Sequence, residues 1–257
     1  EFDMADKDHL NMIITGHIDN GKSTTMGHFL LDLGVVDERT ISAHAKESEE
    51  TGKGDSFKYA WVMDNIKDER ARGITIDLAF QKFETPKFFF TLIDAPGHRD
   101  FVKNMITGAS EADCAVLVLS AKEGETDTAI APGGQAREHA FLLKTLGVKQ
   151  IIVAINKMDD SKFSEDAFNT AKQKGEGLVK SVGYKIDEVP FVPVSGWTGE
   201  NLVKKSENMP WYKGKTLLET FDDFKSPEKP TGKPLRLPIQ DVYSITGVGT
   251  VPVGRVE

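Results

Sequence analysis

The sequence contains one cysteine among its 257 residues, Cys114, so no disulfide can form within the chain. Residues 114–119 are all apolar, a context that favours a buried core residue over a reactive thiol. No apolar run approaches the roughly 18 residues that a membrane-spanning helix needs, and the first residues lack the pattern of a signal peptide. These absences together predict a protein of the reducing cytoplasm.

Positive charge is also scarce. The chain has 32 Lys and Arg against 40 Asp and Glu, which gives a formal net charge of −8. Binding of nucleic acid over a wide surface requires basic side chains that neutralise many phosphates, so the composition argues against it. A nucleic-acid partner would have to be met locally, or by parts that this chain does not contain.

Apolar runs and helical patterns alternate along most of the chain. The alternation predicts an α/β fold, a mostly parallel sheet of six strands with helices on both faces. Ligand sites in such sheets lie at the carboxyl ends of the strands. The expected strands are 10–14, 74–80, 88–93, 115–120, 150–156 and 191–194, and the expected helices outside the long region described below are 22–33, 101–106, 135–146, 164–182 and 216–224.

The first motif lies between the strand at 10–14 and the helix after it. Gly16 and Gly21 are followed by Lys22 and Ser23, with the spacing of a phosphate-binding loop. Glycines let successive backbone N–H groups converge on a phosphate, and the N-terminus of the next helix adds partial positive charge. Lys22 would then reach the terminal phosphates and Ser23 would ligate Mg²⁺. A tight glycine turn is the alternative, but it would need neither Lys nor Ser.

A long polar region at residues 35–73 follows this helix. Thinly buried helices there would suit a segment that reorders with ligand state, although a solvated surface insertion has the same pattern. Thr75, just beyond the region, could place its hydroxyl on Mg²⁺ or could be an ordinary strand threonine. The region is expected to hold a polar helix at 37–51 and an amphipathic helix that runs from Ser56 to Gly73, with Tyr59, Val62, Met63 and Ile66 on its apolar face.

Residues 94–98 follow the strand at 88–93 and form the second motif. Asp94 could lie near Mg²⁺ while the N–H of Gly97 approaches a γ-phosphate, although Asp-x-x-Gly is also an ordinary turn. His98 could orient the attacking water, because positioning and electrostatics dominate the barrier to phosphoryl transfer. A surface histidine in the first turn of a helix is the alternative reading.

Two further motifs point to the base of a nucleotide. Asn156, Lys157 and Asp159 follow the strand at 150–156. A carboxylate held there can accept both N1–H and the 2-amino group of guanine, two donors that adenine does not offer together. Residues 195–197 follow the last strand and could present backbone N–H groups to the guanine oxygen, with Trp197 as an apolar wall.

These motifs, together with residues 69–77, 103–108, 208–211 and 234–243, match one known family. The chain resembles the GTP-binding part of translation elongation factors of the one-alpha type, the archaeal and eukaryotic counterparts of elongation factor Tu. The resemblance implies a phosphate-loop GTPase fold, hydrolysis of GTP to GDP and phosphate, and Mg²⁺ as cofactor. It also implies three partners, namely aminoacyl-tRNA, the ribosome and a guanine-nucleotide exchange factor, and a monovalent cation near Asp19.

The resemblance completes the set of predicted site residues. The nucleotide-binding residues are Gly16, His17, Ile18, Asp19, Asn20, Gly21, Lys22, Ser23, Thr24, Asn156, Lys157, Asp159, Ser195, Gly196 and Trp197. The catalytic residues are His98, Asp94, Gly97, Lys22 and Thr75, with Ile18 and Ile74 as an apolar gate beside His98. The metal ligands are Ser23, Thr75 and Asp94.

Two departures from the family pattern shape the expected organisation. Asn20 replaces the usual Ser or His, which leaves the phosphate loop intact, and the chain stops at Glu257, short of the family's three domains. The expected domains are a GTP-binding domain at 4–226, a linker at 227–234 and, at 235–257, the first strands of an incomplete β-barrel domain. Binding of aminoacyl-tRNA and the ribosome would then be weakened, and the terminal hairpin could pair between molecules.

Three other functions share parts of this pattern. Release-factor or ribosome-rescue GTPases carry the same residues at 94–98, but the stretch at 72–76 favours elongation. A phosphate-loop kinase, or the GTPase subunit of sulfate activation, is the second alternative, and the guanine motif at 156–159 disfavours a kinase. The third is a fragment that binds GDP and partners without turnover.

Overall fold

The computed structural model describes residues 7–50, 57–63, 78–96, 102–227 and 232–254. The chain divides into two compact units, Glu1–Phe224 and Lys225–Glu257. Among the described residues, a six-stranded sheet lies in the first unit and a two-stranded hairpin in the second.

The six-stranded sheet has the order β2-β3-β1-β4-β5-β6. Only β2 runs antiparallel to its neighbour, and the other pairs are parallel. The parallel register pairs Ile14 with both Asp94 and Val116, so the carboxyl ends of the central strands meet at one edge. The strands are β1 (Asp8–Gly16), β2 (Ala79–Glu84), β3 (Phe88–Asp94), β4 (Cys114–Ser120), β5 (Gln150–Asn156) and β6 (Phe191–Pro193).

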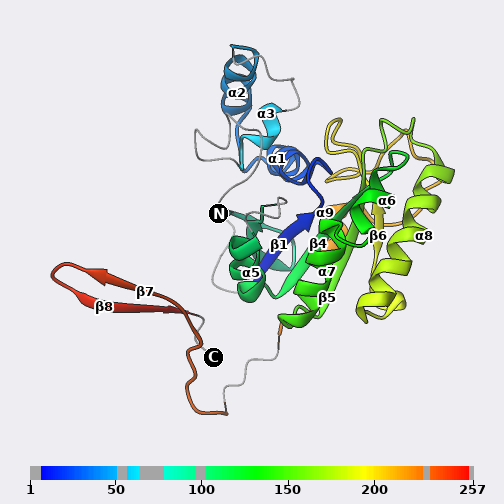
Figure 1. Cartoon of the computed structure of the whole chain (residues 1–257). Helices are drawn as coiled ribbons and strands as arrows, with labels where there is room; N and C mark the ends of the chain where they lie inside the picture. Colours follow the sequence, from blue (N-terminus) through cyan, green and yellow to red (C-terminus); the bar gives the residue numbers. More distant parts are fainter. Residues whose placement is uncertain (1–6, 51–56, 64–77, 97–101, 228–231, 255–257) are drawn as a thin grey trace. The chain divides into compact units, whose positions relative to one another are not determined.

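Helices cover both faces of this sheet (Figure 1). Because side chains alternate along a strand, Ile13 packs with the helices α5, α7 and α8, whereas Met12 and Ile14 pack with α1 and α9. The prediction of a mostly parallel sheet with helices on both faces is confirmed. The helices are α1 (Lys22–Asp32), α2 (Glu38–Glu50), α3 (Phe57–Ala60), α5 (Val102–Glu111), α6 (Glu125–Ile130), α7 (Gln135–Thr145), α8 (Glu165–Val182), the 3₁₀ helix η2 (Ile186–Glu188) and α9 (Leu217–Phe221).

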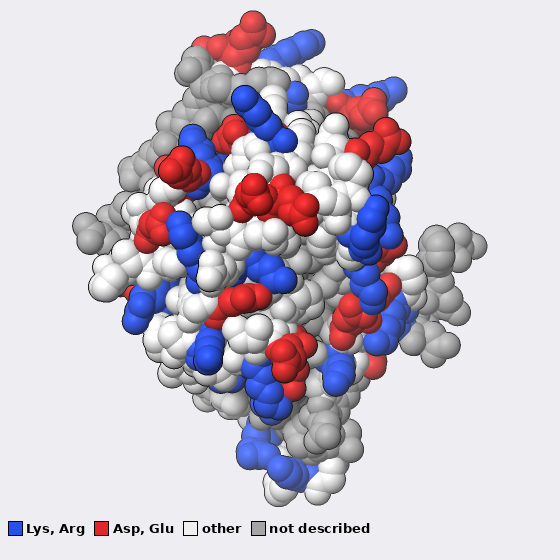
Figure 2. Space-filling model, turned by 90° about the vertical axis from the view of Figure 1, so that its right-hand side faces the viewer, with Lys and Arg blue, Asp and Glu red and all other residues white. Residues whose placement is uncertain are grey.

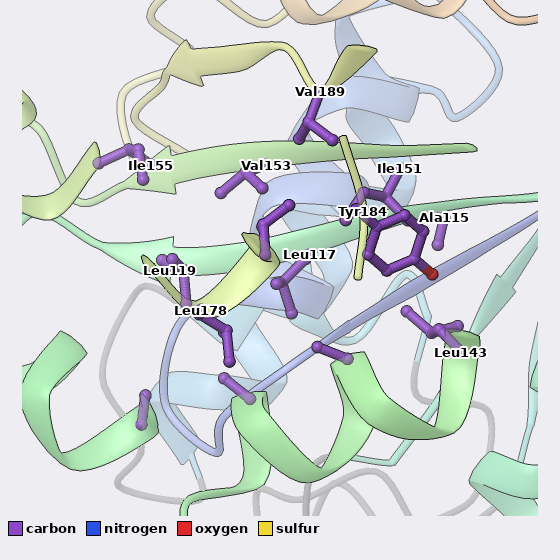
Figure 3. Packing of buried hydrophobic residues seen from close by; sticks show 14 of the residues in the cluster. Ala115, Leu117, Leu119, Leu143, Ile151, Val153, Ile155, Leu178, Tyr184 and Val189 are labelled. Carbon is purple, nitrogen blue, oxygen red and sulfur yellow. The ribbon is translucent and has the colours of Figure 1, made fainter. Parts of the chain in front are cut away.

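Figure 3 shows the core on the α7 and α8 side, where Leu143 and Leu178 meet the strand residues Leu117 and Val153. Cys114 lies in the core of the opposite face, with no exposed surface. Burial raises the pKa of its thiol well above the ordinary value, and the charge of Asp113 adds to the effect. The thiol therefore stays protonated, and the prediction of a core cysteine is confirmed.

The helix α8 is continuous through both of its glycines. Ser164 caps its start by accepting a hydrogen bond from the N–H of Ala167 at 3.3 Å, and Gly183 ends it in the left-handed conformation. A Cβ atom at Gly175 would lie 2.9 Å from the Phe191 ring and 3.0 Å from Leu119. Glycine at 175 thus lets the helix approach the sheet closely, which offsets its low helix propensity.

Several element boundaries differ from the sequence predictions. The helix expected at 216–224 is only Leu217–Phe221, because Thr216 caps its first turn through a capping box and the chain then turns to bury Phe224. The short helix α6 was not predicted, since six residues carry too little periodicity to be recognised.

Part of the long polar region, residues 61–63, is more deeply buried than its sequence indicates. The polar helix expected at 37–51 is present as α2, and among its residues only Ile41 and Ser48 are buried. Within the described part of the expected amphipathic helix, the four residues of α3 are helical, and Trp61, Val62 and Met63 are buried in a turn after it. The expected remainder of that helix, from residue 64 to Gly73, lies outside the described residues.

The hairpin of the second unit consists of β7 (Ile239–Ile245) and β8 (Gly249–Gly254). The predicted strands at 235–243 and 249–256 are therefore correct in number, but the first is shifted toward the turn. Pro234 and Pro238 have no N–H group to donate to a ladder, which keeps the residues around them out of the strand. Gly247 and Gly249 take φ angles of 85° and 100°, which allows a tighter turn than was predicted.

The charged surface fits the composition. On the face drawn in Figure 2, acidic and basic side chains are interspersed over most of the area. No broad basic surface of the kind that holds a nucleic-acid backbone is visible on that face. None of the helices that the structure describes combines the length and the apolar character that crossing a bilayer requires.

Candidate nucleotide-binding site

The loop between β1 and α1 takes a conformation that depends on its two glycines. Gly16 has φ 148°, and a Cβ atom there would lie 2.5 Å from the carbonyl oxygen of Val118. Gly21 has φ 79°, and a Cβ atom there would lie 2.5 Å from Nδ2 of Asn156. Any other residue at either position would push the loop away from its neighbours, so the spacing of the glycines is required by the packing.

Contacts from three directions hold this loop in place. The N–H of Ile18 donates to Oε1 of Gln135 at 3.0 Å, and Nδ2 of Asn20 donates to the carbonyl oxygen of Val118 at 3.0 Å. Nζ of Lys22 reaches back to the carbonyl oxygen of His17 at 3.0 Å. Because α1 begins at Lys22, its first backbone N–H groups lie at the end of the same loop, which makes a site for an anion.

Two oxygen-bearing side chains meet beside the loop. The hydroxyl of Ser23 donates to Oδ2 of Asp94 at 2.7 Å, and Asp94 has no exposed surface at the end of β3. Hard oxygen donors of this kind suit Mg²⁺, which usually takes one or two protein ligands together with phosphate oxygens and water. Among the described residues there is no group of three or more His, Cys, Asp or Glu that could hold a metal ion without such help. Thr24 lies next to Ser23 in the first turn of α1.

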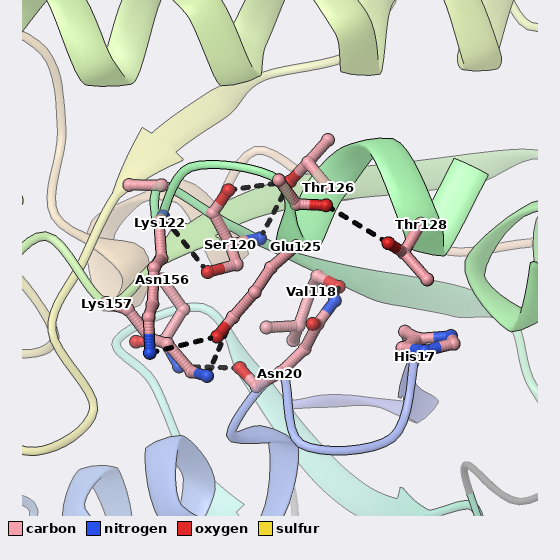
Figure 4. A network of polar contacts seen from close by, with 12 residues as sticks. His17, Asn20, Val118, Ser120, Lys122, Glu125, Thr126, Thr128, Asn156 and Lys157 are labelled. Atoms are coloured by element: carbon pink, nitrogen blue, oxygen red, sulfur yellow. Dashed lines mark hydrogen bonds and ion pairs between the residues drawn. The ribbon is translucent and has the colours of Figure 1, made fainter. Parts of the chain in front are cut away.

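Asn156 joins the loop at 16–23, through the Asn20 contact drawn in Figure 4, to the loop after β6. Its Nδ2 donates to the carbonyl oxygen of Asn20 at 2.8 Å, and its Oδ1 accepts the N–H of Gly196 at 2.8 Å. The side chain is 3% exposed. One buried amide therefore sets the distance between two segments that the sequence separates widely.

Asp159 and Ser195 also lie together, since the Ser195 hydroxyl donates to Oδ1 of Asp159 at 2.5 Å. Ser195 Oγ in turn accepts the N–H of Thr198 at 3.1 Å. This leaves the carboxylate of Asp159 half-buried and held by a residue of the neighbouring loop. A carboxylate fixed in this way has a defined direction in which to accept donors from a bound base.

Lys157 occupies a left-handed backbone position with φ 63°, and its Nζ forms an ion pair with Oε2 of Glu125 at 2.7 Å. Burial alone would raise the pKa of the Glu125 carboxyl, but hydrogen bonds from Lys157 and Ser120 outweigh it and lower the pKa below its ordinary value. The ion pair fixes the stem of Lys157 beside Asn156. Glu125 belongs to the unpredicted helix α6, so sequence reasoning missed it.

The family is now decided by comparison. The elongation factor Tu GTP binding domain family matches residues 7–227. The chain belongs to this family.

Individual relatives agree with that assignment. Elongation factor 1-alpha of Cenarchaeum symbiosum is 85% identical over 254 residues, which cover 99% of this chain and 58% of the relative. The protein of the same name from Ignicoccus hospitalis is 59% identical, covering 98% of this chain and 58% of the relative. The chain thus spans about 58% of the length of these curated relatives.

Solved structures give the same picture. Sup35 complexed with GDP superposes with a TM-score of 0.65 and 32% identity, covering 100% of this chain and 54% of that one. The Ski7 GTPase-like domain bound to GTP superposes with a TM-score of 0.74 at 24% identity, over 95% of this chain and 56% of that one. At 24% identity, the likeness to Ski7 shows the fold alone.

Two buried histidines support the site of this elongation factor Tu family domain, and neither was predicted to contact it. Nδ1 of His139 lies 2.7 Å from the hydroxyl of Thr15 below the phosphate loop. Burial, together with the charge of Lys22, lowers the pKa of His139 to about 3, so its ring is neutral. His28 lies 2.9 Å from the carbonyl oxygen of Gly196. Both contacts join residues far apart in sequence, and no local motif signals them.

The structure brings together the predicted residues that it describes. Those of the phosphate loop, Asp94, Asn156, Lys157, Asp159 and residues 195–197 gather at one edge of the sheet. Asp19 has φ 63° within the loop, and Trp197 is 38% exposed at its border. Ile74, Thr75, Gly97 and His98 lie outside the described residues.

Proposed function

We propose that this chain binds GTP, hydrolyses it to GDP and phosphate, and acts as the GTPase part of a translation factor that delivers aminoacyl-tRNA to the ribosome in elongation. The observation that carries the proposal is the bridge from Asn20 through Asn156 to Gly196, with Asp159 held by Ser195 beside it. The family match and the 85% identity to an elongation factor 1-alpha support it. Delivery of aminoacyl-tRNA is proposed for the whole protein, of which this chain spans a part.

Selectivity for guanine would rest on Asp159. Its carboxylate would accept N1–H and the 2-amino group of the base, while Ser195 keeps it oriented. Adenine presents no such pair of donors, so in an adenine complex the carboxylate would gain no hydrogen bond from the base. Lys157, held by Glu125, and Trp197 would border the base on its two faces.

The phosphates would lie in the loop at 16–23. Lys22 would exchange its contact with the carbonyl oxygen of His17 for the terminal phosphates, and the N–H groups at the start of α1 would complete the cradle. Ser23 and Asp94 fit a Mg²⁺ ion by their oxygen donors and 2.7 Å separation, with Thr75 as a third ligand. When bound, Mg²⁺ would neutralise charge on the phosphate oxygens. Asp19 would contribute to a monovalent cation site.

Hydrolysis would depend on residues 97 and 98. Gly97 would donate its N–H to the γ-phosphate, and His98 would orient the attacking water between Ile18 and Ile74. Turnover would be slow without the ribosome, because the barrier to phosphoryl transfer is set by how precisely His98 and the attacking water are positioned. A guanine-nucleotide exchange factor would then restore the GTP form.

Elongation is the proposed role because an elongation factor 1-alpha is 85% identical over 99% of this chain. The proposed domains are the GTP-binding domain at 4–226, the linker at 227–234 and the start of a barrel domain at 235–257. Several apolar side chains of the hairpin are exposed, including Ile239 and Val248, which would allow pairing with another molecule. The cytoplasm is the compartment that ribosomal delivery would require.

Calorimetry with GDP and ADP tests the nucleotide part of the proposal. We expect GDP to bind and ADP to bind at least about a hundredfold more weakly, the discrimination that two unpaired hydrogen-bonding groups produce. Equal binding of the two would refute guanine selectivity. Hydrolysis of GTP by the full-length factor, measured with and without ribosomes, tests the rest, and no detectable hydrolysis in either case would favour a GDP-binding protein without turnover.

A further inference from the structure

Each residue of the loop 195–197 is held by a different neighbour. Asp159 accepts the hydroxyl of Ser195, and Asn156 accepts the N–H of Gly196. Both anchors belong to the motif that follows β5. Further side-chain contacts to this loop come from His28 of α1 and from Tyr59 and Lys58 of α3, three residues outside the predicted nucleotide-binding set.

His28 of α1 contacts the loop through Gly196. Its Nδ1 lies 2.9 Å from the carbonyl oxygen of Gly196, and because a carbonyl can only accept, Nδ1 carries the proton. Its Nε2 lies 3.8 Å from Oδ1 of Asp32. The ring is 8% exposed, and Gly199 leaves room for it, since a Cβ atom there would lie 2.8 Å from Nε2. His28 therefore cannot move without moving the loop.

Tyr59 of α3 touches both His28 and Trp197. Its ring stacks on His28 with the centroids 4.2 Å apart and the planes at 9°, and it meets Trp197 edge-on at 5.9 Å and 71°. The ammonium of Lys58 lies 5.1 Å from the centre of the Trp197 ring. Stacked and edge-on pairs at these distances are attractive beyond their buried area, and so is a cation over an indole.

The position of α3 is itself well determined. At Gly27 a Cβ atom would overlap the carbonyl oxygen of Tyr59, so α3 sits directly on the backbone of α1. The turn that follows α3 buries Trp61 and Met63, which are 1% and 0% exposed. The packing of α3 on α1 and the buried turn after α3 therefore hold Tyr59 beside Trp197.

We propose that Tyr59 is a positioning residue for the guanine base, acting through Trp197 and His28, and that base binding in turn strengthens the docking of α3 on α1. The inference rests on the proposed function, because it assumes that guanine lies against Trp197 and Asp159. The two effects are equal in size by thermodynamic linkage, since each site stabilises the same arrangement of the other. Residues 57–63 would thereby respond to binding of the base.

Calorimetry of GDP binding tests the first half. Tyr59→Leu should weaken GDP binding about threefold to tenfold, the loss that removal of one or two aromatic pairs produces, whereas Tyr59→Phe should bind as the parental chain does. Tyr212→Leu is the matched control, because Tyr212 packs against Phe168 and Trp211 and makes no contact with the loop 195–197 that the described residues show. It should leave GDP affinity unchanged.

Hydrogen exchange of residues 57–63, with and without GDP, tests the second half. GDP should slow exchange there in the parental chain and in Tyr59→Phe. The factor should be close to the ratio of the GDP affinities of the parental chain and Tyr59→Leu, and the slowing should be lost in Tyr59→Leu. Gly27→Ala provides a second route, since the added Cβ displaces Tyr59 without altering any side chain at the base, and it should weaken GDP binding as Tyr59→Leu does. Because Gly27→Ala retains Tyr59, it also tests the inference if Tyr59→Leu fails to fold.

Parental affinity for GDP in Tyr59→Leu and in Gly27→Ala would overturn the inference, as would exchange at 57–63 that GDP leaves unchanged. Either result, obtained while the parental chain binds GDP and rejects ADP, would leave the proposed function standing. Failure of the parental chain to bind GDP would instead overturn the proposed function and the inference with it.

Discussion

Replacement of Asn156 by Ala removes the amide that joins the two loops of the candidate site. In the parental chain its Nδ2 and Oδ1 each make a 2.8 Å hydrogen bond, one to the carbonyl oxygen of Asn20 and one to the N–H of Gly196. The variant deprives both backbone groups of these partners in a region where the side chain is 3% exposed. We therefore expect two separate consequences, one for stability and one for nucleotide affinity.

The loss of stability can be bounded from these two contacts. A buried backbone group left unpaired costs about 1–3 kcal/mol, so the pair sets an upper range of about 2–6 kcal/mol. Water can enter beside the phosphate loop and form hydrogen bonds with the two unpaired backbone groups. The free energy of unfolding should therefore fall by about 2–3 kcal/mol. Nucleotide affinity should fall about tenfold or more, because the loops that would border the base and the phosphates are no longer tied to each other.

Asn201→Ala serves as the matched control. Asn201 is 1% exposed and its Nδ2 donates to the carbonyl oxygen of Pro193 at 2.8 Å, but it does not touch the phosphate loop. Its φ of 60° also favours Asn over Ala, so the control should lose about 1–3 kcal/mol of stability. Its GDP affinity should stay at the parental value.

The assay combines urea unfolding, followed by circular dichroism, with calorimetry of GDP binding on the same preparations. If Asn156→Ala lost stability and yet bound GDP as tightly as Asn201→Ala, the bridge would be a packing feature with no role in the site. If it lost no stability, the unpaired groups would have found other partners and the energetic argument would be wrong.

Three further predictions follow from the site and the chain organisation. Asp159→Asn should weaken GTP and relatively favour xanthosine nucleotides, because one of the two acceptor oxygens is replaced by an NH2 donor, and competition binding with both nucleotides measures this. His98→Ala should abolish most ribosome-stimulated hydrolysis in the full-length factor while GTP binding persists, and a parental rate would remove His98 from the mechanism. Deletion of residues 234–257 should leave GDP affinity nearly unchanged, and a folded but non-binding product would show that the domain boundary is misplaced.

Much of the fold was predictable from local patterns. Buried parallel strands are continuous apolar runs, and amphipathic helices have a distinct period, so the five parallel strands and α8 could be recognised from neighbouring residues alone. The antiparallel strand β2 continues to Glu84 instead of ending at residue 80 as expected. Boundaries were less predictable where tertiary contacts decided them. Phe224 continues the apolar spacing of α9 but is buried by a turn, and Trp61, Val62 and Met63 are buried in the turn that follows α3.

The candidate site also has a part that local sequence predicts and a part that depends on tertiary structure. The glycines, Lys22 and Ser23 carry their chemistry in one contiguous motif, and Asp159 carries a carboxylate at the end of a recognisable strand. Their gathering at one edge follows from the parallel order of the strands. The nucleotide-binding roles themselves stay predictions.

By itself the sequence determined the α/β class, the phosphate-loop motif and the resemblance to a GTPase family, because each depends on residues within a few positions of one another. Only the tertiary structure decided that Asn156 bridges two loops, that Glu125 holds Lys157, and that Tyr59 meets Trp197. These partners come from separate helices and strands, and no local period or spacing encodes which of them will be neighbours. A hydrogen bond or a ring contact between distant segments exists only once the sheet and its helices have fixed the distance between them.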